Sequence, residues 1–201
     1  MTNRPLQDTV GGLRLFWWVR ALRGGFALLF AALLLFIRTL LGTLFFDPVL
    51  LVFLTLLLGF YVFGNGILFV IASIFARQHR LPHWGLVLSE GVVAIALGAF
   101  IACTLFLDVH SMALLAGLNA LAAGIFQLIL GIRMRIYRPY LLLLGLAGIV
   151  SIAVGVLFLH APGESIPVVV ERLCAFEFFY AAVNVYFAAQ LHRNPSPNMT
   201  G

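Results

Sequence analysis

Two glutamates, Glu90 and Glu177, lie inside long apolar runs of the sequence, where a charged side chain is unexpected. A charge at the centre of a membrane helix costs about 2.5–3.5 kcal/mol on insertion scales, so such residues usually face a partner or a water-filled space. A carboxyl group in that setting can gain and lose a proton, because loss of water disfavours its charged form. These two residues are therefore candidates either for buried structural pairs or for proton exchange inside a membrane.

Glu90 shares a helix face with small residues. Ala94, Gly98 and Ala102 follow it at four-residue intervals, which places all four side chains on one side of a helix. Small residues let membrane helices approach one another closely, so we expect Glu90 to point into a bundle and away from lipid. Two roles remain open for it: a structural ion pair with Arg23, or a protonatable site.

Glu177 belongs to a second stripe of small and polar residues, and it is the acidic residue expected deepest in the membrane. The other members of this stripe are Cys174, Ala181, Asn184 and Ala188. Glu177 has a proton-linked or ligand-linked role, or it is held by hydrogen bonds to Asn184 or Gln127. We expect Gln127 itself, beside a small-residue face of the fourth apolar run, to serve mainly in helix packing.

We expect Arg38 and Glu171 near the outer surface of the membrane, within about one to two helical turns of it. Long side chains at that depth reach the interface, so an ion pair of Arg38 with Glu171, or with Asp47, has a structural role. The five histidines lie in links or at helix ends, and neither Cys103 nor Cys174 has a CxxC partner. We therefore expect no metal, no cofactor and no catalytic constellation, and hence no enzyme.

The elements that position these residues are membrane helices. The chain is 63% hydrophobic and only 9% charged, with a mean hydropathy of +1.12, which is typical of integral membrane proteins. The apolar runs are continuous, as in helices, and do not alternate as in transmembrane barrels. We expect one membrane domain over residues 16–193, preceded by a cytoplasmic segment at 1–15 and followed by a tail at 194–201. The six expected spans are 18–42, 48–75, 84–107, 110–132, 139–160 and 166–191.

The charge of +5 is interpreted as topology. All twelve basic residues are arginines, and with six spans ten of them fall on one side of the membrane. By the positive-inside rule, both termini are then cytoplasmic. The basic and aromatic interleaving of nucleic-acid-binding surfaces is absent, so no nucleic-acid partner is expected.

The sequence also contains an internal repeat of two helices, at about 18–77, 84–135 and 139–193. Gly25, Gly91 and Gly148 align in the first helices, and residues 66, 124 and 182 in the second helices are 58 apart. Because each unit crosses twice, the three units are parallel. The predicted fold is all-α, with six transmembrane helices as three parallel two-helix hairpins.

Four features of the sequence belong together: the start Arg23-Gly-Gly-Phe-Ala after Trp17-Trp18, the three repeats, the basic helix ends, and the turn prolines Pro48 and Pro162. In these features the chain resembles the HdeD-like (DUF308) short-repeat family of bacterial membrane proteins. The middle repeat departs from this pattern, because it has Asp108-Val-His110 and no proline. The resemblance implies a multi-pass protein of the bacterial inner membrane, with acid resistance in some members. It transfers no catalytic residue.

Two functions follow. The first is a non-enzymatic inner-membrane protein that supports envelope stress or acid tolerance, or is a structural or accessory membrane subunit. The alternative is a small proton-linked transporter or channel that uses Glu90 and Glu177. The lipid bilayer is the expected partner, and a homo-oligomer or a membrane complex fits either function.

Overall fold

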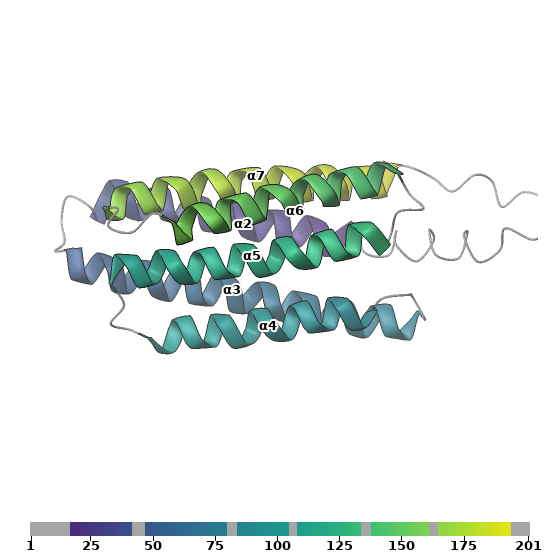
Figure 1. Cartoon of the computed structure of the whole chain (residues 1–201), viewed down its shortest axis with the longest axis horizontal. Helices are drawn as coiled ribbons and strands as arrows, with labels where there is room; N and C mark the ends of the chain where they lie inside the picture. The colour runs from purple at the N-terminus through teal and green to yellow at the C-terminus, as the bar shows by residue number, and fades with distance from the viewer. Residues whose placement is uncertain are drawn as a thin grey trace, which may run out of the picture.

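The computed structural model describes residues 17–41, 47–79, 84–104, 108–133, 138–160 and 165–193. These residues form six helices arranged side by side in one elongated bundle (Figure 1). In chain order, the helices are α2 (Trp17–Leu41), α3 (Asp47–Gln78), α4 (Trp84–Cys103), α5 (Val109–Arg133), α6 (Arg138–Leu159) and α7 (Ile166–Arg193). The prediction of an all-helical protein is confirmed.

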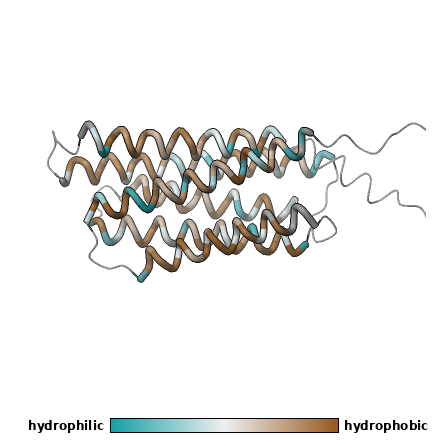
Figure 2. Tube along the Cα trace, turned by 90° about the horizontal axis from the view of Figure 1, so that it is seen from above, coloured by the Kyte–Doolittle hydropathy of each residue, from teal (hydrophilic) through white to brown (hydrophobic). Residues whose placement is uncertain are grey.

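Four of these helices are long and apolar enough to cross a membrane, at Trp17–Thr39, Val49–Gln78, Trp84–Cys103 and Val109–Arg133. In α6 the described apolar part is shorter, Leu144–Leu159, and α7 carries three charged residues in its first half. Apolar residues predominate along the helices, and hydrophilic residues collect toward the helix ends (Figure 2). The apolar helices indicate a membrane-embedded protein.

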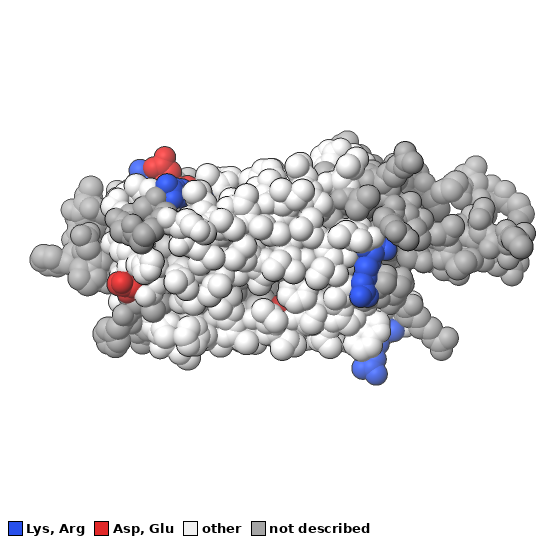
Figure 3. Space-filling view, in the orientation of Figure 1, with Lys and Arg blue, Asp and Glu red and all other residues white. Residues whose placement is uncertain are grey.

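Charged side chains avoid the middle of the outer surface. On the face shown in Figure 3 they lie at the two ends of the bundle, with an almost uncharged band between them. The end where α2 begins shows only basic side chains, and the opposite end shows both signs. Large apolar side chains such as Phe60, Leu142 and Ile149 are exposed along the sides. Such a surface suits a hydrocarbon environment, since lipid replaces water as the solvent.

The helix ends agree with the expected spans to within a few residues, with one clear exception. The third span was predicted to reach residue 107; α4 ends at Cys103, and residues 105–107 lie outside the described residues. At this end the Thr104 hydroxyl donates to the carbonyls of Phe100 and Ile101, at 2.8 and 3.0 Å. The Thr104 backbone nitrogen donates to the same two carbonyls, at 3.1 and 3.2 Å, so the last carbonyls of α4 are satisfied locally.

The closest helix packing joins helices of different predicted hairpins and is not found within a hairpin. The closely packed pairs are α3 with α4, α5 with α6, and α2 with α7. The helices of each predicted hairpin, such as α4 and α5, touch less extensively. The short links brought the hairpin helices near one another, but the small-residue faces decide which helices make close contact.

Glycines explain the first two pairs. A Cβ atom at Gly98 of α4 would lie 2.4 Å from the backbone nitrogen of Phe63 on α3. On α5, a Cβ at Gly124 would lie 2.8 Å from the carbonyl oxygen of Gly148 on α6. Any side chain would hold the backbones apart at these points. The backbones therefore touch directly, which favours weak Cα–H···O contacts across the pair.

The α2–α7 pair is built differently. A Cβ at Gly24 would lie 2.8 Å from a methyl of Val185 and 3.2 Å from the carbonyl of Ala181, whereas Gly25 has nothing within 4 Å. Gly24, and not the aligned Gly25, therefore makes the helix contact of α2, while the alignment of Gly25 with Gly91 and Gly148 as a sequence repeat stays a prediction. The α7 side offers Ala181 and Val185 in place of glycine, so the contact shifts by one residue.

Candidate functional site

One face of α2 and one face of α7 bring charged residues into the bundle. The buried face of α2 repeats at three- and four-residue intervals, at Val19, Arg23, Ala27, Phe30 and Leu34. Arg23 is the charged member of this otherwise apolar face and is only 3% exposed. The buried face of α7 likewise carries polar groups, and these are Glu177, Tyr180 and Asn184.

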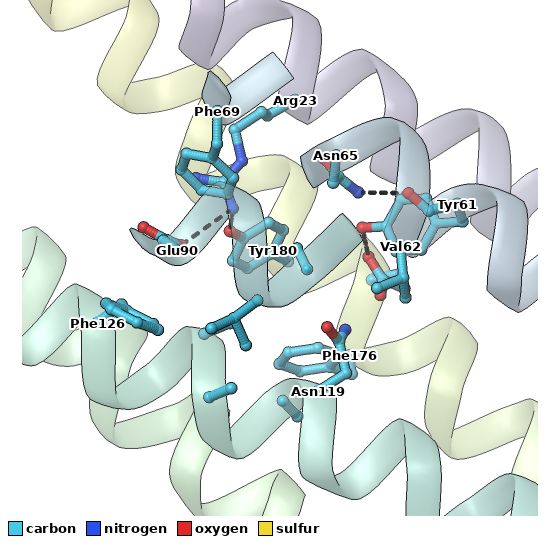
Figure 4. A pocket seen from close by; sticks show the side chains of 16 residues that line it. Arg23, Tyr61, Val62, Asn65, Phe69, Glu90, Asn119, Phe126, Phe176 and Tyr180 are labelled. Atoms are coloured by element: carbon cyan, nitrogen blue, oxygen red, sulfur yellow. Dashed lines mark hydrogen bonds and ion pairs between the residues drawn. The ribbon is translucent and has the colours of Figure 1, made fainter. Parts of the chain in front are cut away.

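Arg23 is the centre of a buried polar network. Its Nη2 donates a hydrogen bond to the hydroxyl oxygen of Tyr180 on α7. The same nitrogen lies 4.0 Å from Glu90 Oε1 on α4. The guanidinium carbon stands 3.8 Å over the ring of Phe69 from α3, close enough for a cation–π interaction. Residues of four helices thus meet at one cation (Figure 4).

Glu90 points into the bundle, as its small-residue face predicted, and is 7% exposed. The ion pair expected with Arg23 is present in the structure at 4.0 Å. That distance exceeds a hydrogen bond, and Glu90 Oε1 has no hydrogen-bond partner among the described residues. The carboxylate is therefore close to a cation but not fully satisfied by it.

Glu177 is held by a different group. The hydroxyl of Tyr61 on α3 donates to Glu177 Oε2 at 2.5 Å, and both residues are buried. Tyr61 is itself stacked on Phe30 of α2, with ring centroids 4.1 Å apart and planes 6° from parallel. This stacking fixes the tyrosine that orients the carboxylate.

The predicted hydrogen bonds of Glu177 with Asn184 or Gln127 are not found. Gln127 Nε2 donates to the Tyr180 hydroxyl at 3.0 Å, and Asn184 donates to the Tyr180 carbonyl at 2.8 Å. Asn184 also accepts from Arg20 at 3.3 Å. Both amides therefore serve the Arg23–Tyr180 group, because they lie closer than Glu177 to the basic end of the bundle.

A cavity of about 50 Å³ separates the two carboxylates, and both of them line it. Roughly 10–15 Å³ is enough for one water molecule, so this space holds a few waters or one small ion. Figure 4 shows Glu90, Arg23 and Tyr180 at one side of the cavity and Tyr61 with Asn65 at the other. Phe126 and Phe176 supply ring surface to the wall, from α5 and α7.

The cavity lies near the boundary of α4 and α5, and residues of both helices line it. A small area of acidic side chain is visible in the middle of the bundle side, over this boundary (Figure 3). The boundary is one of the less closely packed ones, which leaves room for the cavity beside it.

Several buried polar atoms around the cavity have no hydrogen-bond partner among the described residues. These are Arg23 Nε, Asn65 Oδ1, Glu90 Oε1 and, just beyond the cavity, Gln127 Oε1. An unsatisfied polar atom inside a bilayer costs several kcal/mol, so these atoms need water or a ligand. The geometry is that of a small pocket with unsatisfied polar atoms inside an apolar bundle.

The pair of Arg38 and Glu171 lies elsewhere. The two side chains are 3.5 Å apart and largely exposed, near the ends of α2 and α7 opposite the basic end. This distance matches the structural pair expected from the sequence, while the side chain of Asp47 lies outside the described residues. Neither residue of this pair lines the cavity.

Sequence reasoning missed Tyr61, Phe69, Asn65 and Tyr180. Tyr180 lies three residues after Glu177 and four before Asn184, so the stripe on α7 already contained it. Tyr61 was also within reach, because residues 61, 119 and 177 follow the 58-residue spacing of the repeat. These residues are Tyr61, Asn119 and Glu177, and all three line the cavity.

No group of three or more potential metal-binding side chains occurs within the described ranges. The carboxylates, hydroxyls and amides that line the cavity can transfer protons, form hydrogen bonds and bind small polar species. Comparison with family models, with characterised proteins and with solved structures gave no match to this chain.

Proposed function

We propose that this chain is a small proton-linked transporter or channel, whose central cavity contains the protonatable carboxylates Glu90 and Glu177. The observation that carries the proposal is the pair of buried carboxylates facing one small polar cavity in an apolar bundle. Intramembrane acidic residues in such a setting are typical of proton relays.

The surroundings support exchange of protons at this cavity. Glu177 receives its hydrogen bond from a neutral hydroxyl, which remains in place as an acceptor or donor whether or not the carboxyl is protonated. Arg23 favours the charged form of Glu90. Two carboxylates in unequal surroundings suit a step in which one holds a proton while the other is charged.

The same proposal includes the membrane topology. Six spans in three parallel two-helix repeats place Tyr61, Asn119 and Glu177 at equivalent positions, and all three line one cavity. The residues before Gly24, Gly91 and Gly148 are Arg23, Glu90 and Ala147, and all three are buried. The basic end near the start of α2 is then cytoplasmic, in a bacterial inner membrane.

Proton flux into proteoliposomes under an imposed pH gradient tests the function. We expect liposomes containing the protein to take up protons faster than empty ones, and the Glu177→Gln variant to lose most of this flux. Glu171→Gln is the matched control, because this glutamate is largely exposed and away from the cavity. Wild-type flux equal to that of empty liposomes would exclude the proposal.

A second candidate is the non-enzymatic role in envelope stress or acid tolerance, or as an accessory membrane subunit. The favouring observation is that much of the network is already bonded internally, through Arg23, Tyr180 and Gln127, as in a structural core. The HdeD-like start of the sequence points the same way. Bacterial survival after acid shock, with and without the gene, measures this role, and rescue by Glu177→Gln would separate it from proton transport.

A further inference from the structure

We propose that the cavity binds a small monovalent cation of the ammonium type, which enters as a proton leaves Glu177. This inference rests on the proposed proton-linked function and names the species coupled to the proton. Three independent features of the cavity carry it: its charge, its unpartnered acceptors and its aromatic wall.

The charge of the lining residues is unbalanced. Among the side chains that line the cavity, Arg23 is the cation, and Glu90 and Glu177 are the carboxylates. If both carboxylates are ionised, one negative charge remains in a low-dielectric interior, which is costly. Arg20, one turn nearer the start of α2, also interacts electrostatically with Glu90, but it bonds Asn184 and does not line the cavity. One proton or one monovalent cation restores neutrality, so the two compete for the same place.

The unpartnered acceptors select a donor-rich occupant. Asn65 is only 8% exposed, and its Oδ1 has no hydrogen-bond partner among the described residues. Glu90 Oε1 likewise has no hydrogen-bond partner among the described residues, although Arg23 lies 4.0 Å from it. Both residues line the cavity, and an ammonium ion carries enough N–H donors to serve both together with Glu177.

The wall and the volume favour a compact cation. Phe126 and Phe176 expose ring surface to the cavity, and aromatic faces attract cations, most strongly when the cation is desolvated. A volume of about 50 Å³ admits ammonium or methylammonium but not a bulky quaternary amine. The same walls disfavour a small anion, since two carboxylates already face the space.

The exchange is balanced. The protonated carboxyl of Glu177 releases H⁺ to water, and the carboxylate that remains pairs with the incoming ammonium ion, so the net charge of the cavity is unchanged. The charged and titratable groups that face Glu177 are Arg23 from α2, Tyr61 from α3, Glu90 from α4, and Cys174 and Tyr180 on α7. The lining residues of α5 are neutral.

Calorimetric titration of the purified full-length protein in detergent micelles, with ammonium chloride, tests the inference. We expect saturable binding of ammonium above the micelle control. Potassium chloride should give no such binding, because potassium has no hydrogen-bond donors. The affinity for ammonium should fall about tenfold for each pH unit of acidification while Glu177 is protonated. Titrations in buffers of different ionisation enthalpy should show one proton released per cation. Tetramethylammonium should bind at least tenfold more weakly than methylammonium.

Matched variants locate the site. Glu177→Gln should abolish proton release and weaken ammonium binding at least tenfold, and Asn65→Leu should weaken binding without abolishing proton release. Glu171→Gln should change neither. Binding that is independent of pH, or equal in wild type and Glu177→Gln, overturns the inference.

Infrared titration of the carboxyl band separates this inference from the proposed function. If Glu177 titrates in the wild-type protein and that band is missing in Glu177→Gln, but ammonium does not bind, the cation site is refuted and the proton site stands. If ammonium binding removes the protonated-carboxyl band at constant pH, the exchange is supported.

Discussion

The two sides of the central cavity handle a buried carboxylate in different ways. On one side Glu90 lies 4.0 Å from the Arg23 guanidinium, which in turn is held by Tyr180 and packed over Phe69. On the other side Glu177 receives a 2.5 Å hydrogen bond from the Tyr61 hydroxyl. The first carboxylate is a member of a charged cluster, and the second is held by a neutral donor.

This difference indicates separate roles for residues that look alike in the sequence. Removing one member of a buried ion pair leaves the other charge uncompensated, so Glu90 matters for stability. Glu177 can change its charge without breaking an ion pair, because its partner Tyr61 is neutral. Glu177 is therefore the better candidate for binding and releasing a proton. Variants on each side test this division.

The largest effect is expected for Glu90→Gln. The substitution keeps the shape of the side chain but leaves the Arg23 charge without its carboxylate, which should lower the free energy of unfolding by about 3 kcal/mol. Thermal unfolding in detergent, followed by circular dichroism, measures the change. Glu177→Gln should cost much less, because glutamine still accepts from Tyr61.

The double variant Arg23→Gln/Glu90→Gln sharpens this result. It removes both charges, so its loss of unfolding free energy should be smaller than the sum of the losses in the two single variants. Strictly additive losses, or equal melting of Glu90→Gln and Glu177→Gln, would contradict the division between the two sides.

A smaller loss is expected when α4, which carries Glu90, is displaced from α3. The Cβ of Gly98→Ala would meet the Phe63 backbone at 2.4 Å, and overpacking of this kind costs about 2 kcal/mol. Gly25→Ala is the matched control on α2, because nothing lies within 4 Å of its added methyl group. Melting temperatures of the two variants should diverge, and a stable Gly98→Ala protein would show that the α3–α4 contact is looser than described.

On the Glu177 side, Tyr61→Phe removes the hydroxyl but keeps the ring stacked on Phe30. Loss of this hydrogen bond should cost about 1 kcal/mol. It should also change the pH midpoint of the Glu177 carboxyl band in infrared titration, whereas Glu90 should be unaffected. An unchanged midpoint for Glu177 would mean that Tyr61 does not control its protonation.

The smallest effect is expected at Asp108, which touches neither side of the cavity. Its carboxylate accepts from the Ser111 backbone nitrogen at 2.9 Å and caps the start of α5. Hydrogen bonds from the Ser111 side chain and backbone lower the pKa of Asp108 below its ordinary value. Because the folded pKa is the lower one, the stabilisation is present above the unfolded pKa and is lost as the pH falls through the folded value.

Asp108→Asn keeps a capping oxygen but cannot titrate. We therefore expect the melting temperature of the wild type to fall slightly more than that of the variant in acid, below the ordinary carboxyl pKa. Parallel curves for the two proteins would show that the cap does not contribute to acid sensitivity.

Much of the fold was predictable because apolar runs of about 20 residues and their polar breaks are local features of the sequence. The buried orientation of Glu90 was also predictable, since Ala94, Gly98 and Ala102 mark the packed face of its helix. The end of α4 at Cys103 was missed, because the hydropathy of the run stays high beyond it and does not report where helical hydrogen bonding stops.

The contacts of the site were harder to predict because they join distant parts of the chain. Tyr61 and Glu177 are separated by 116 residues, and their bond depends on where α3 lies relative to α7. The helix pairing was missed for a related reason. Short links favour neighbours within a hairpin, but the glycines of α3 with α4, and of α5 with α6, favour close contact between successive hairpins.

The contact between α2 and α7 has a consequence for the biogenesis of the protein. Arg23 and its acceptor Tyr180 are 157 residues apart, so the ribosome makes α2 long before it makes α7. Until α7 packs against α2, the Arg23 side chain lacks that acceptor, and other polar groups must shelter it. Packing of α7 is thus the step that completes the cavity, which couples correct assembly to the formation of the proposed proton site.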